Sequence, residues 1–220
     1  WSPEGILVGN GSNELIQALL AVFLADGDRL VIPSPTFTVY QLVGTVYGAE
    51  VVTVPLNDDY TFDTTAVRDT FLDSGDMLIL CSPNNPTGAM YPIDEVAAVC
   101  EATSKPVVVD EAYYEFAGES VRPLLERFDN LIVLRTFSKA FSLAGLRVGY
   151  ALMNPALAAE VSKAKLPYNI IFFSMAVAEK LLSERERLAE SIETIIAERD
   201  RLISAMNAIG SVNAYPSRAN

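Results

Sequence analysis

The sequence predicts an α/β protein of three layers, in which helices cover both faces of a mostly parallel, seven-stranded sheet. Short apolar segments alternate along the chain with longer segments whose apolar residues recur at helical spacing. Most of the apolar segments end in loops rich in glycine, proline, asparagine or hydroxyl residues. This alternation is typical of parallel sheets with right-handed crossovers, and 220 residues, half of them hydrophobic, are enough to bury the core of one large domain.

The first predicted unit is a strand, Ile6–Val8, followed by a glycine turn and a helix with apolar residues from Leu15 onwards. A glycine turn before a helix exposes backbone N–H groups at the positive end of the helix dipole, where an anion such as phosphate binds. The dinucleotide fingerprint requires a third glycine where this chain has Glu14, and the turn lacks the Gly-Lys-Ser/Thr of a P-loop. Alternatively, Ser12 or Asn13 caps the helix, and the two interpretations are compatible.

The remaining strands and helices follow in alternation. Short apolar runs predict strands at Arg29–Ile32, Glu50–Pro55, Met77–Cys81, Pro106–Val109, Leu131–Leu134 and Val148–Leu152. Helical spacing predicts helices at Val39–Tyr47, at Asp63–Leu72 with an acidic cap, at Ile93–Ala102 and, with many Glu/Arg pairs, at Glu184–Ile209. Residues 1–180 are predicted to form one large domain, and residues 181–220 a linker helix and the beginning of a small α/β domain.

Two loops at strand ends carry candidate site residues. In Ser82–Gly88, with the sequence SPNNPTG, two prolines fix the backbone so that an asparagine amide can point at a ligand. An Asx-type turn without a ligand explains the same segment. Asp110 follows the apolar strand Pro106–Val109, and an acid in that position is usually either a cap or a site residue.

A single lysine, Lys139, ends the loop that follows the sixth predicted strand. The loop also carries Thr136 and Ser138, and Arg147 follows after Gly145, a glycine that can let the backbone turn. Two hydroxyls and a guanidinium fork suit a phosphate group. A lysine beside that arginine has its ammonium form disfavoured, which frees the amine to attack a carbonyl. Taken alone, the loop is also compatible with a surface loop of solvated charges.

Composition excludes several classes of function. The net charge of −12 argues against binding the phosphate backbone of nucleic acids. The chain has no histidine, which removes histidine-based nucleophile systems and most zinc sites, and no metal site is predicted. The two cysteines, Cys81 and Cys100, are expected to be reduced core residues of a cytoplasmic protein, because their spacing suits neither a metal nor a disulfide framework.

The sequence shows neither an apolar run of about 20 residues nor the layout of a signal peptide, so we expect no membrane association. The chain begins at Trp1 and stops at Asn220 in the middle of a pattern, and we expect it to be a fragment.

Five loop motifs occur together and in a characteristic order. They are GNGSNE at Gly9–Glu14, PTFTVY at Pro35–Tyr40, SPNNPTG at Ser82–Gly88, VDEAYYEF at Val109–Phe116 and RTFSKAFSLAGLRVGY at Arg135–Tyr150. With these motifs the chain resembles the fold-type I pyridoxal-phosphate aminotransferases, most closely the histidinol-phosphate aminotransferase group. The resemblance spans nearly the whole chain and implies the large domain of that fold with pyridoxal 5'-phosphate as cofactor.

The resemblance implies a role for each matched residue. Lys139 is expected to form the Schiff base with the cofactor aldehyde and to shuttle the proton, and Asp110 to pair with the pyridine nitrogen. Asn85 and Tyr113 match the donors to the phenolate oxygen of the ring, and Phe37 matches the aromatic residue that stacks on it. The matched phosphate cup consists of Gly11, Ser12, Asn13, Thr136, Ser138 and Arg147.

The implied reaction is transamination between an amino donor and a 2-oxo acid, with L-histidinol phosphate and 2-oxoglutarate expected, as in histidine biosynthesis. An aromatic amino acid aminotransferase and a decarboxylase of amino-acid phosphates stay open as alternatives. A nucleotide-binding module, or a protein of this fold that has lost catalysis, is the non-enzymatic alternative. The family also implies a homodimer, with an N-terminal arm and a substrate-carboxylate arginine outside this chain. Arg218 is expected to be a surface residue.

Overall fold

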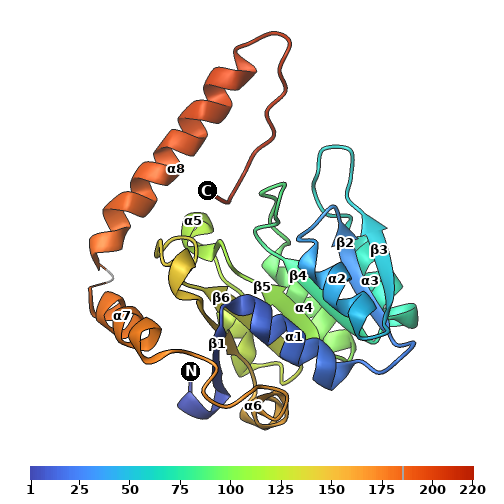
Figure 1. Cartoon of the computed structure of the whole chain (residues 1–220). Helices are drawn as coiled ribbons and strands as arrows, with labels where there is room; N and C mark the ends of the chain where they lie inside the picture. Colours follow the sequence, from blue (N-terminus) through green and yellow to red (C-terminus); the bar gives the residue numbers. More distant parts are fainter. Residues whose placement is uncertain (185) are drawn as a thin grey trace.

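The computed structural model describes residues 1–184 and 186–220 and has the predicted three-layer architecture (Figure 1). The described residues form a seven-stranded sheet with the order β1-β7-β6-β5-β4-β2-β3. Its strands are β1 (Ile6–Asn10), β2 (Arg29–Ser34), β3 (Glu50–Pro55), β4 (Met77–Cys81), β5 (Val107–Asp110), β6 (Leu131–Thr136) and β7 (Val148–Leu152). Only β7 runs antiparallel to its neighbours, β1 and β6, so the predicted α/β class and mostly parallel sheet are confirmed.

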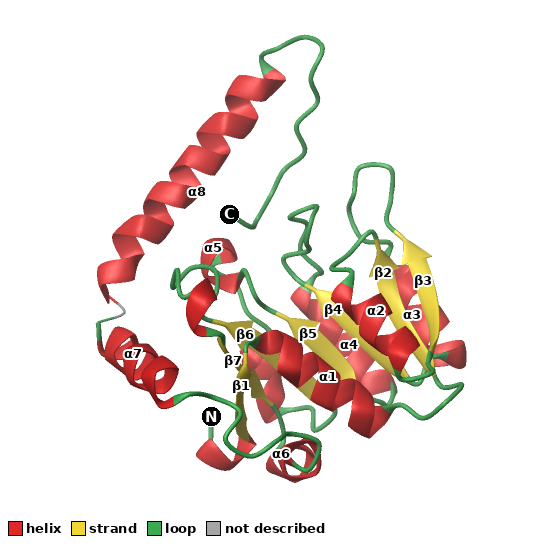
Figure 2. Cartoon of the chain, in the orientation of Figure 1, coloured by secondary structure: helices red, strands yellow, loops and turns green. Residues whose placement is uncertain are grey.

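Helices cover both faces of this sheet (Figure 2). They are α1 (Ser12–Phe23), α2 (Val39–Val46), α3 (Thr64–Ser74), α4 (Ile93–Ala102), α5 (Tyr114–Ala117), α6 (Pro155–Ser162), α7 (Phe172–Ser183) and α8 (Glu186–Asn207). Short 3-10 helices occur at η1 (Pro3–Gly5), η2 (Arg122–Glu126) and η3 (Ala144–Leu146). The sequence patterns did not predict α5, α6 and α7, whereas the acidic cap of α3 is confirmed, because Asp63 accepts a hydrogen bond from the Ala66 N–H.

Most of the core lies in two apolar clusters, one on each face of the sheet, and a smaller third cluster contains Phe137, Val148 and Ala178. Of the two large clusters, one packs α1, α2 and α6 against residues such as Ile79 of β4, and the other packs α3, α4 and η2 against the alternate residues, such as Leu80. All five residues of β4 are buried, as expected for a central parallel strand covered on both sides. The helices cover the two faces of the sheet but not the carboxyl ends of its strands, and open α/β sheets bind ligands at those ends.

The C-terminal part leaves the sheet along α8 and returns as an extended tail (Figure 1). The predicted helix Glu184–Ile209 is shorter at its end than expected, because Asn207 exchanges hydrogen bonds with the backbone of Ala214 and turns the chain. Residue 185 of that prediction lies outside the described residues. The predicted domain division after residue 180 stays a prediction.

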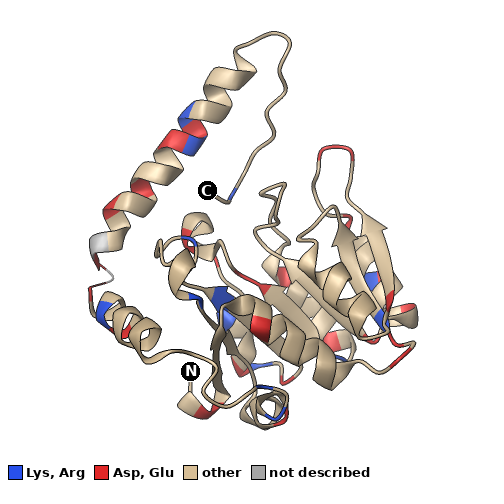
Figure 3. Cartoon of the chain, viewed as in Figure 1, with Lys and Arg blue, Asp and Glu red and all other residues tan. Residues whose placement is uncertain are grey.

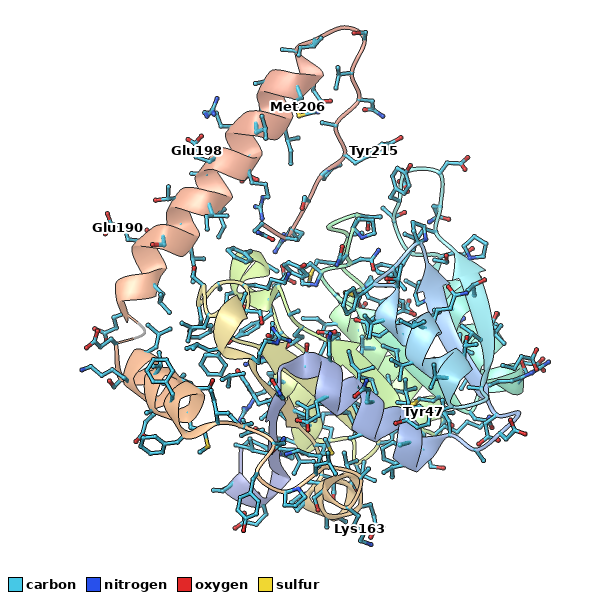
Figure 4. All side chains as sticks on the ribbon, viewed as in Figure 1. Tyr47, Lys163, Glu190, Glu198, Met206 and Tyr215 are labelled. Atoms are coloured by element: carbon cyan, nitrogen blue, oxygen red, sulfur yellow. The ribbon has the colours of Figure 1, made fainter. Side chains whose placement is uncertain are left out.

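The surface of α8 is strongly charged. The first half of α8 carries acidic residues, and acidic and basic residues lie together further along it (Figure 3); Glu190 and Glu198 lie on its outer side (Figure 4). In the tail, Arg218 is half exposed, as expected of a surface residue, and its guanidinium donates to the Ala117 carbonyl. No helix in the described residues is long and apolar enough to cross a membrane.

Candidate active site

The carboxyl ends of β4, β5 and β6 bring the predicted site residues together in one cavity. The strands are in register, with Cys81 beside Asp110 and Asp110 beside Leu134. The cavity has a volume of about 230 Å³, a size for a small molecule. It is lined by Ser12, Asn13, Phe37, Cys81, Asn85, Asp110, Ala112, Tyr113, Thr136, Ser138, Lys139, Ala144 and Arg147. Of the predicted residues, only Gly11 is not in the lining, and it directly precedes Ser12.

Asp110 is a buried carboxyl group at the end of β5, with only 2% of its surface exposed. The Tyr40 hydroxyl of α2 donates to its Oδ2 at 2.7 Å, and the Ala112 N–H donates to its Oδ1 at 3.1 Å. Burial raises the pKa of Asp110 to about 6, although these two hydrogen bonds and the charge of Lys139 act to lower it. Asp110 is therefore the site's buried negative charge, held by groups that favour its ionised form.

Lys139 lies on a loop that the protein fixes tightly. The neighbouring Phe137 and Ala140 are buried, and the Phe137 N–H donates to the Val148 carbonyl of β7. The lysine side chain itself is exposed toward the cavity, with its Nζ 5.1 Å from the centre of the Tyr113 ring. The loop is thus not a solvated surface loop, and it presents a single amine to the cavity.

Hydroxyl groups, a guanidinium and a helix N-terminus meet at the end of the cavity near α1. Thr136 Oγ1 donates to Ser138 Oγ at 3.0 Å, and Arg147 Nη1 lies 3.5 Å from the same Ser138 oxygen. The Arg147 guanidinium occupies the space that a Cβ on Gly11 would fill. Gly11 also has a φ of 75°, so both the backbone and the guanidinium require glycine there. These donors suit an anion with several oxygens.

Two local expectations for this end are wrong. The N-cap of α1 is Gly11, which has no side chain to accept a hydrogen bond, so neither Ser12 nor Asn13 caps the helix. The turn before β7 does not depend on Gly145, which lies inside η3; the left-handed residues are Ser142 and Arg147, with φ of 56° and 55°. The helical φ and ψ of η3 suit any residue, and the left-handed backbone at Arg147 places its side chain in the cavity lining.

The two asparagines of the SPNNPTG loop have different tasks. Asn84 is 1% exposed; its amide nitrogen donates to the Pro35 carbonyl at 3.0 Å, and its oxygen accepts from the Thr36 hydroxyl at 2.7 Å. It thereby ties this loop to the loop that carries Phe37. Asn85 is half-buried in the cavity wall, and its side chain hydrogen-bonds to no protein group within the described residues. The side chain of Asn84 thus joins two loops and does not make an Asx turn, because its oxygen accepts from the Thr36 hydroxyl; the ligand interpretation stays a prediction for Asn85.

The sequence model of the family "Aminotransferase class I and II" matches residues 1–220. The chain belongs to the class I and II aminotransferases. The histidinol-phosphate aminotransferase of Caldanaerobacter subterraneus subsp. tengcongensis is 40% identical over 220 residues, which make up 100% of this chain and 62% of that protein. The one from Thermococcus gammatolerans is 39% identical over 219 residues, with the same shares of 100% and 62%. The chain thus spans about 62% of the length of these curated relatives.

Solved structures agree with this family. The histidinol-phosphate aminotransferase from Sinorhizobium meliloti, in complex with pyridoxal-5'-phosphate, has a TM-score of 0.92 at 28% identity and covers 100% of this chain and 61% of its own. The L-threonine-O-3-phosphate decarboxylase from Porphyromonas gingivalis has a TM-score of 0.86 at 25% identity, and the match covers 99% of this chain and 65% of the decarboxylase. The resemblance to the fold-type I enzymes and to the histidinol-phosphate aminotransferase group is confirmed.

The sequence patterns did not indicate two polar neighbours of this candidate site. Tyr40 lies three residues after Phe37, at a spacing that indicates a core aromatic, and nothing in that spacing indicates its bond to Asp110. Cys81 is a free, buried thiol as expected, but it also lines the cavity. Burial raises the pKa of Cys81 to about 12, so it stays a neutral thiol beside Asp110.

Proposed function

We propose that this chain is the cofactor-binding part of a pyridoxal-5'-phosphate-dependent aminotransferase that transfers the amino group of L-histidinol phosphate to 2-oxoglutarate. The observation that carries the proposal is the placement of one amine, Lys139, and one buried carboxyl, Asp110, in the same small cavity. The names of the similar proteins support the choice of substrate.

The residues present fit this cofactor. The first turn of α1, the Ser12 and Ser138 hydroxyls and the Arg147 guanidinium offer several donors to its phosphate group. Phe37 offers a ring face in the cavity wall, and the Asn85 amide is a donor with no protein partner in the described part of the chain. When bound, pyridoxal phosphate supplies an electron sink that stabilises negative charge on the α-carbon of the amino donor.

In this proposal each side chain acts on a stated atom. Asp110 holds a proton on the ring nitrogen, because a buried carboxylate favours the positively charged form of its partner. Tyr113 and Asn85 donate hydrogen bonds to the ring hydroxyl oxygen. Lys139 would hold the cofactor through its Nζ at the aldehyde carbon, with loss of water. Once the amino group of the donor has replaced it there, the free Lys139 amine would take the proton from the α-carbon of the donor. Gly11, Asn13 and Thr136 complete the phosphate cup, together with Ser12, Ser138 and Arg147.

Two further activities remain as competing candidates. The similarity to a decarboxylase of L-threonine O-3-phosphate favours loss of CO2 from an amino-acid phosphate on the same scaffold. An aromatic amino acid aminotransferase is the other alternative. The full-length protein is incubated with L-histidinol phosphate, L-phenylalanine or L-threonine O-3-phosphate, and glutamate formation from 2-oxoglutarate and CO2 release are both measured. Glutamate formed fastest from histidinol phosphate supports the proposal, and CO2 release without glutamate contradicts it.

We further propose that the protein acts as a cytoplasmic homodimer. Large apolar side chains are exposed in one segment, 166–175, including Tyr168 at 99%, Phe172 at 81% and Leu166 at 76% exposure. Patches of this kind mark association surfaces. The free thiols of Cys81 and Cys100 are typical of a reducing compartment. Light scattering of the purified full-length protein tests the dimer, and a monomer at micromolar concentration contradicts it.

A further inference from the structure

A buried ion pair lies between the ends of β5 and β6, behind the cavity. Glu111 is 2% exposed, and Arg135 donates to its Oε2 from Nη2 at 2.8 Å and from Nε at 3.0 Å. Successive side chains of a strand point to opposite faces. Since Asp110 and Thr136 line the cavity, Glu111 and Arg135, which adjoin them in sequence, lie on the other face of the sheet.

The surroundings of the pair satisfy its polar groups. The Ser120 hydroxyl donates to Glu111 Oε2 at 2.9 Å and accepts from Arg135 Nη2 at 2.7 Å. The Val121 N–H donates to Glu111 Oε1 at 2.7 Å, and the Arg135 guanidinium stacks on the Tyr114 ring at 3.6 Å. The pair is therefore a fixed crosslink whose geometry is determined from several sides.

The crosslink is placed where the two strands separate. At the end of the β5–β6 ladder, the Glu111 N–H donates to the Leu134 carbonyl at 2.8 Å. Beyond this bond the segment after β5 leads to Tyr113 and α5, and the segment that continues β6 leads to Lys139. The Glu111–Arg135 ion pair joins the two segments at this point. Glu111 lies one residue after Asp110, and Arg135 lies four residues before Lys139.

We propose that Glu111 and Arg135 are positioning residues, whose ion pair sets the separation between Asp110 and Lys139. The inference rests on the proposed function, because the rigid ring of pyridoxal phosphate then has to contact both residues at once. Stability alone does not account for the pair, since the desolvation of two buried charges offsets most of their attraction. A role in positioning accounts for the pair, because a misplacement of about 1 Å in such a site reduces the rate about 100-fold.

The test uses the full-length protein with the variants Glu111→Gln, Arg135→Lys and Ser120→Ala. The matched control is Arg122→Gln, which removes the surface pair of Arg122 with Glu126 from the adjoining helix η2. Three properties are measured: the affinity of the cofactor-free protein for pyridoxal phosphate, the circular dichroism of the bound cofactor, and kcat and KM. Unfolding by urea measures stability separately.

We expect Glu111→Gln and Arg135→Lys to weaken cofactor binding about tenfold and to lower kcat about 100-fold with little change in KM. Arg135→Lys keeps the charge but loses the planar fork, so its defect identifies geometry as the cause. Ser120→Ala is expected to change the same properties in the same direction by a smaller factor, and Arg122→Gln to change none of them.

The inference is overturned if Arg135→Lys and Ser120→Ala match the unchanged protein in cofactor affinity, circular dichroism and kcat, even where they lower the urea midpoint. These two variants decide the question if Glu111→Gln does not fold. A full-length protein that binds the cofactor but does not transaminate histidinol phosphate contradicts the proposed function alone. The cofactor affinities of the variants still test the positioning residues in that case.

Discussion

The two ends of the cavity differ in how the protein holds their charged groups. At the closed end, defined by Asp110, Tyr40 and Ala112, the carboxyl group is buried and both of its oxygens accept hydrogen bonds from the protein. At the open end, defined by Ser138, Lys139 and Arg147, the two cations are exposed. Charge at the closed end is therefore governed by desolvation, whereas charge at the open end is screened by water until a ligand covers it.

This difference suggests a division of labour. A buried charge with fixed partners needs no rearrangement when a ligand arrives, and such preorganised groups contribute most to stabilising a transition state. Exposed cations on a well-anchored loop attract and bind an anion and leave room for exchange of substrate. In the proposed enzyme the closed end controls the electronics of the cofactor, and the open end holds its phosphate and performs proton transfer.

The largest effect is expected from Lys139→Ala, which removes the only amine among the described residues that line the cavity. We expect turnover to fall about 1,000-fold or more, because the variant lacks both the covalent link and the proton carrier. Borohydride reduction of the unchanged protein, followed by peptide mapping, is expected to place the cofactor on Lys139. A label on Lys105, Lys163 or Lys165 instead contradicts the assignment, and Lys163→Ala serves as the control.

The next effect concerns the closed end. Asp110→Asn keeps the shape and the hydrogen-bond acceptor but removes the negative charge. We expect turnover to fall about 100- to 1,000-fold, since a charge-assisted pair in a water-poor site contributes several kcal/mol. Steady-state kinetics of the full-length protein measure this, with the exposed Asp59→Asn as a control. Near-normal turnover removes Asp110 from the mechanism and, with it, the distinction between the two ends.

The closed end also predicts a pH dependence of the cofactor-free protein. The pKa of Asp110 is raised by burial from 3.8 to about 6, so the folded state keeps a proton that the unfolded chain releases earlier. The stabilisation is complete below pH 3.8 and is lost as the pH rises to about 6, a change of about 3 kcal/mol. Urea unfolding of Asp110→Asn and the unchanged protein between pH 4 and 7 measures it. A constant difference between the two proteins contradicts the prediction.

Much of this architecture could be predicted from local sequence patterns. Apolar runs such as Met77–Cys81 are buried on both faces, so their pattern determines a strand, and parallel strands place their terminal loops at one edge. The contact of Tyr40 with Asp110 joins residues 70 positions apart. It depends on how α2 packs on the sheet, and no spacing in the sequence encodes that. The ion pair of Glu111 with Arg135 was missed for the same reason, since it appears only when β5 and β6 are neighbours.

Backbone conformation at the open end was the least predictable. Glycine at position 145 suggested the turn, but the left-handed residues are Ser142 and Arg147, which carry side chains. Such residues are rare, and tertiary contacts rather than local preference hold them there. The guanidinium of Arg147 donates to the Ala144 carbonyl at 2.9 Å and lies against Gly11, in the space that a Cβ on that residue would occupy.

The smallest effect, and the sharpest test of the open end, comes from a pair of glycine variants. Gly11 and Gly118 have nearly the same positive φ, 75° and 72°, but their ψ values are 168° and 6°. An alanine at Gly118 takes the left-handed helical region at a cost of about 1–3 kcal/mol of unfolding free energy, whereas at Gly11 it takes a region that essentially only glycine adopts and costs more. Ligand affinity, measured on folded protein, is therefore the property to compare. Only at Gly11 does the added Cβ meet the Arg147 guanidinium, whereas at Gly118 it meets no atom within 4 Å. We therefore expect Gly11→Ala to weaken pyridoxal phosphate binding about tenfold, the value of a hydrogen bond to a charged group, and Gly118→Ala to leave it unchanged. Fluorescence titration of the two cofactor-free variants measures the difference. Equal affinities mean that the position of Arg147 does not matter for the phosphate, and the open end then acts through α1 and the hydroxyl groups alone.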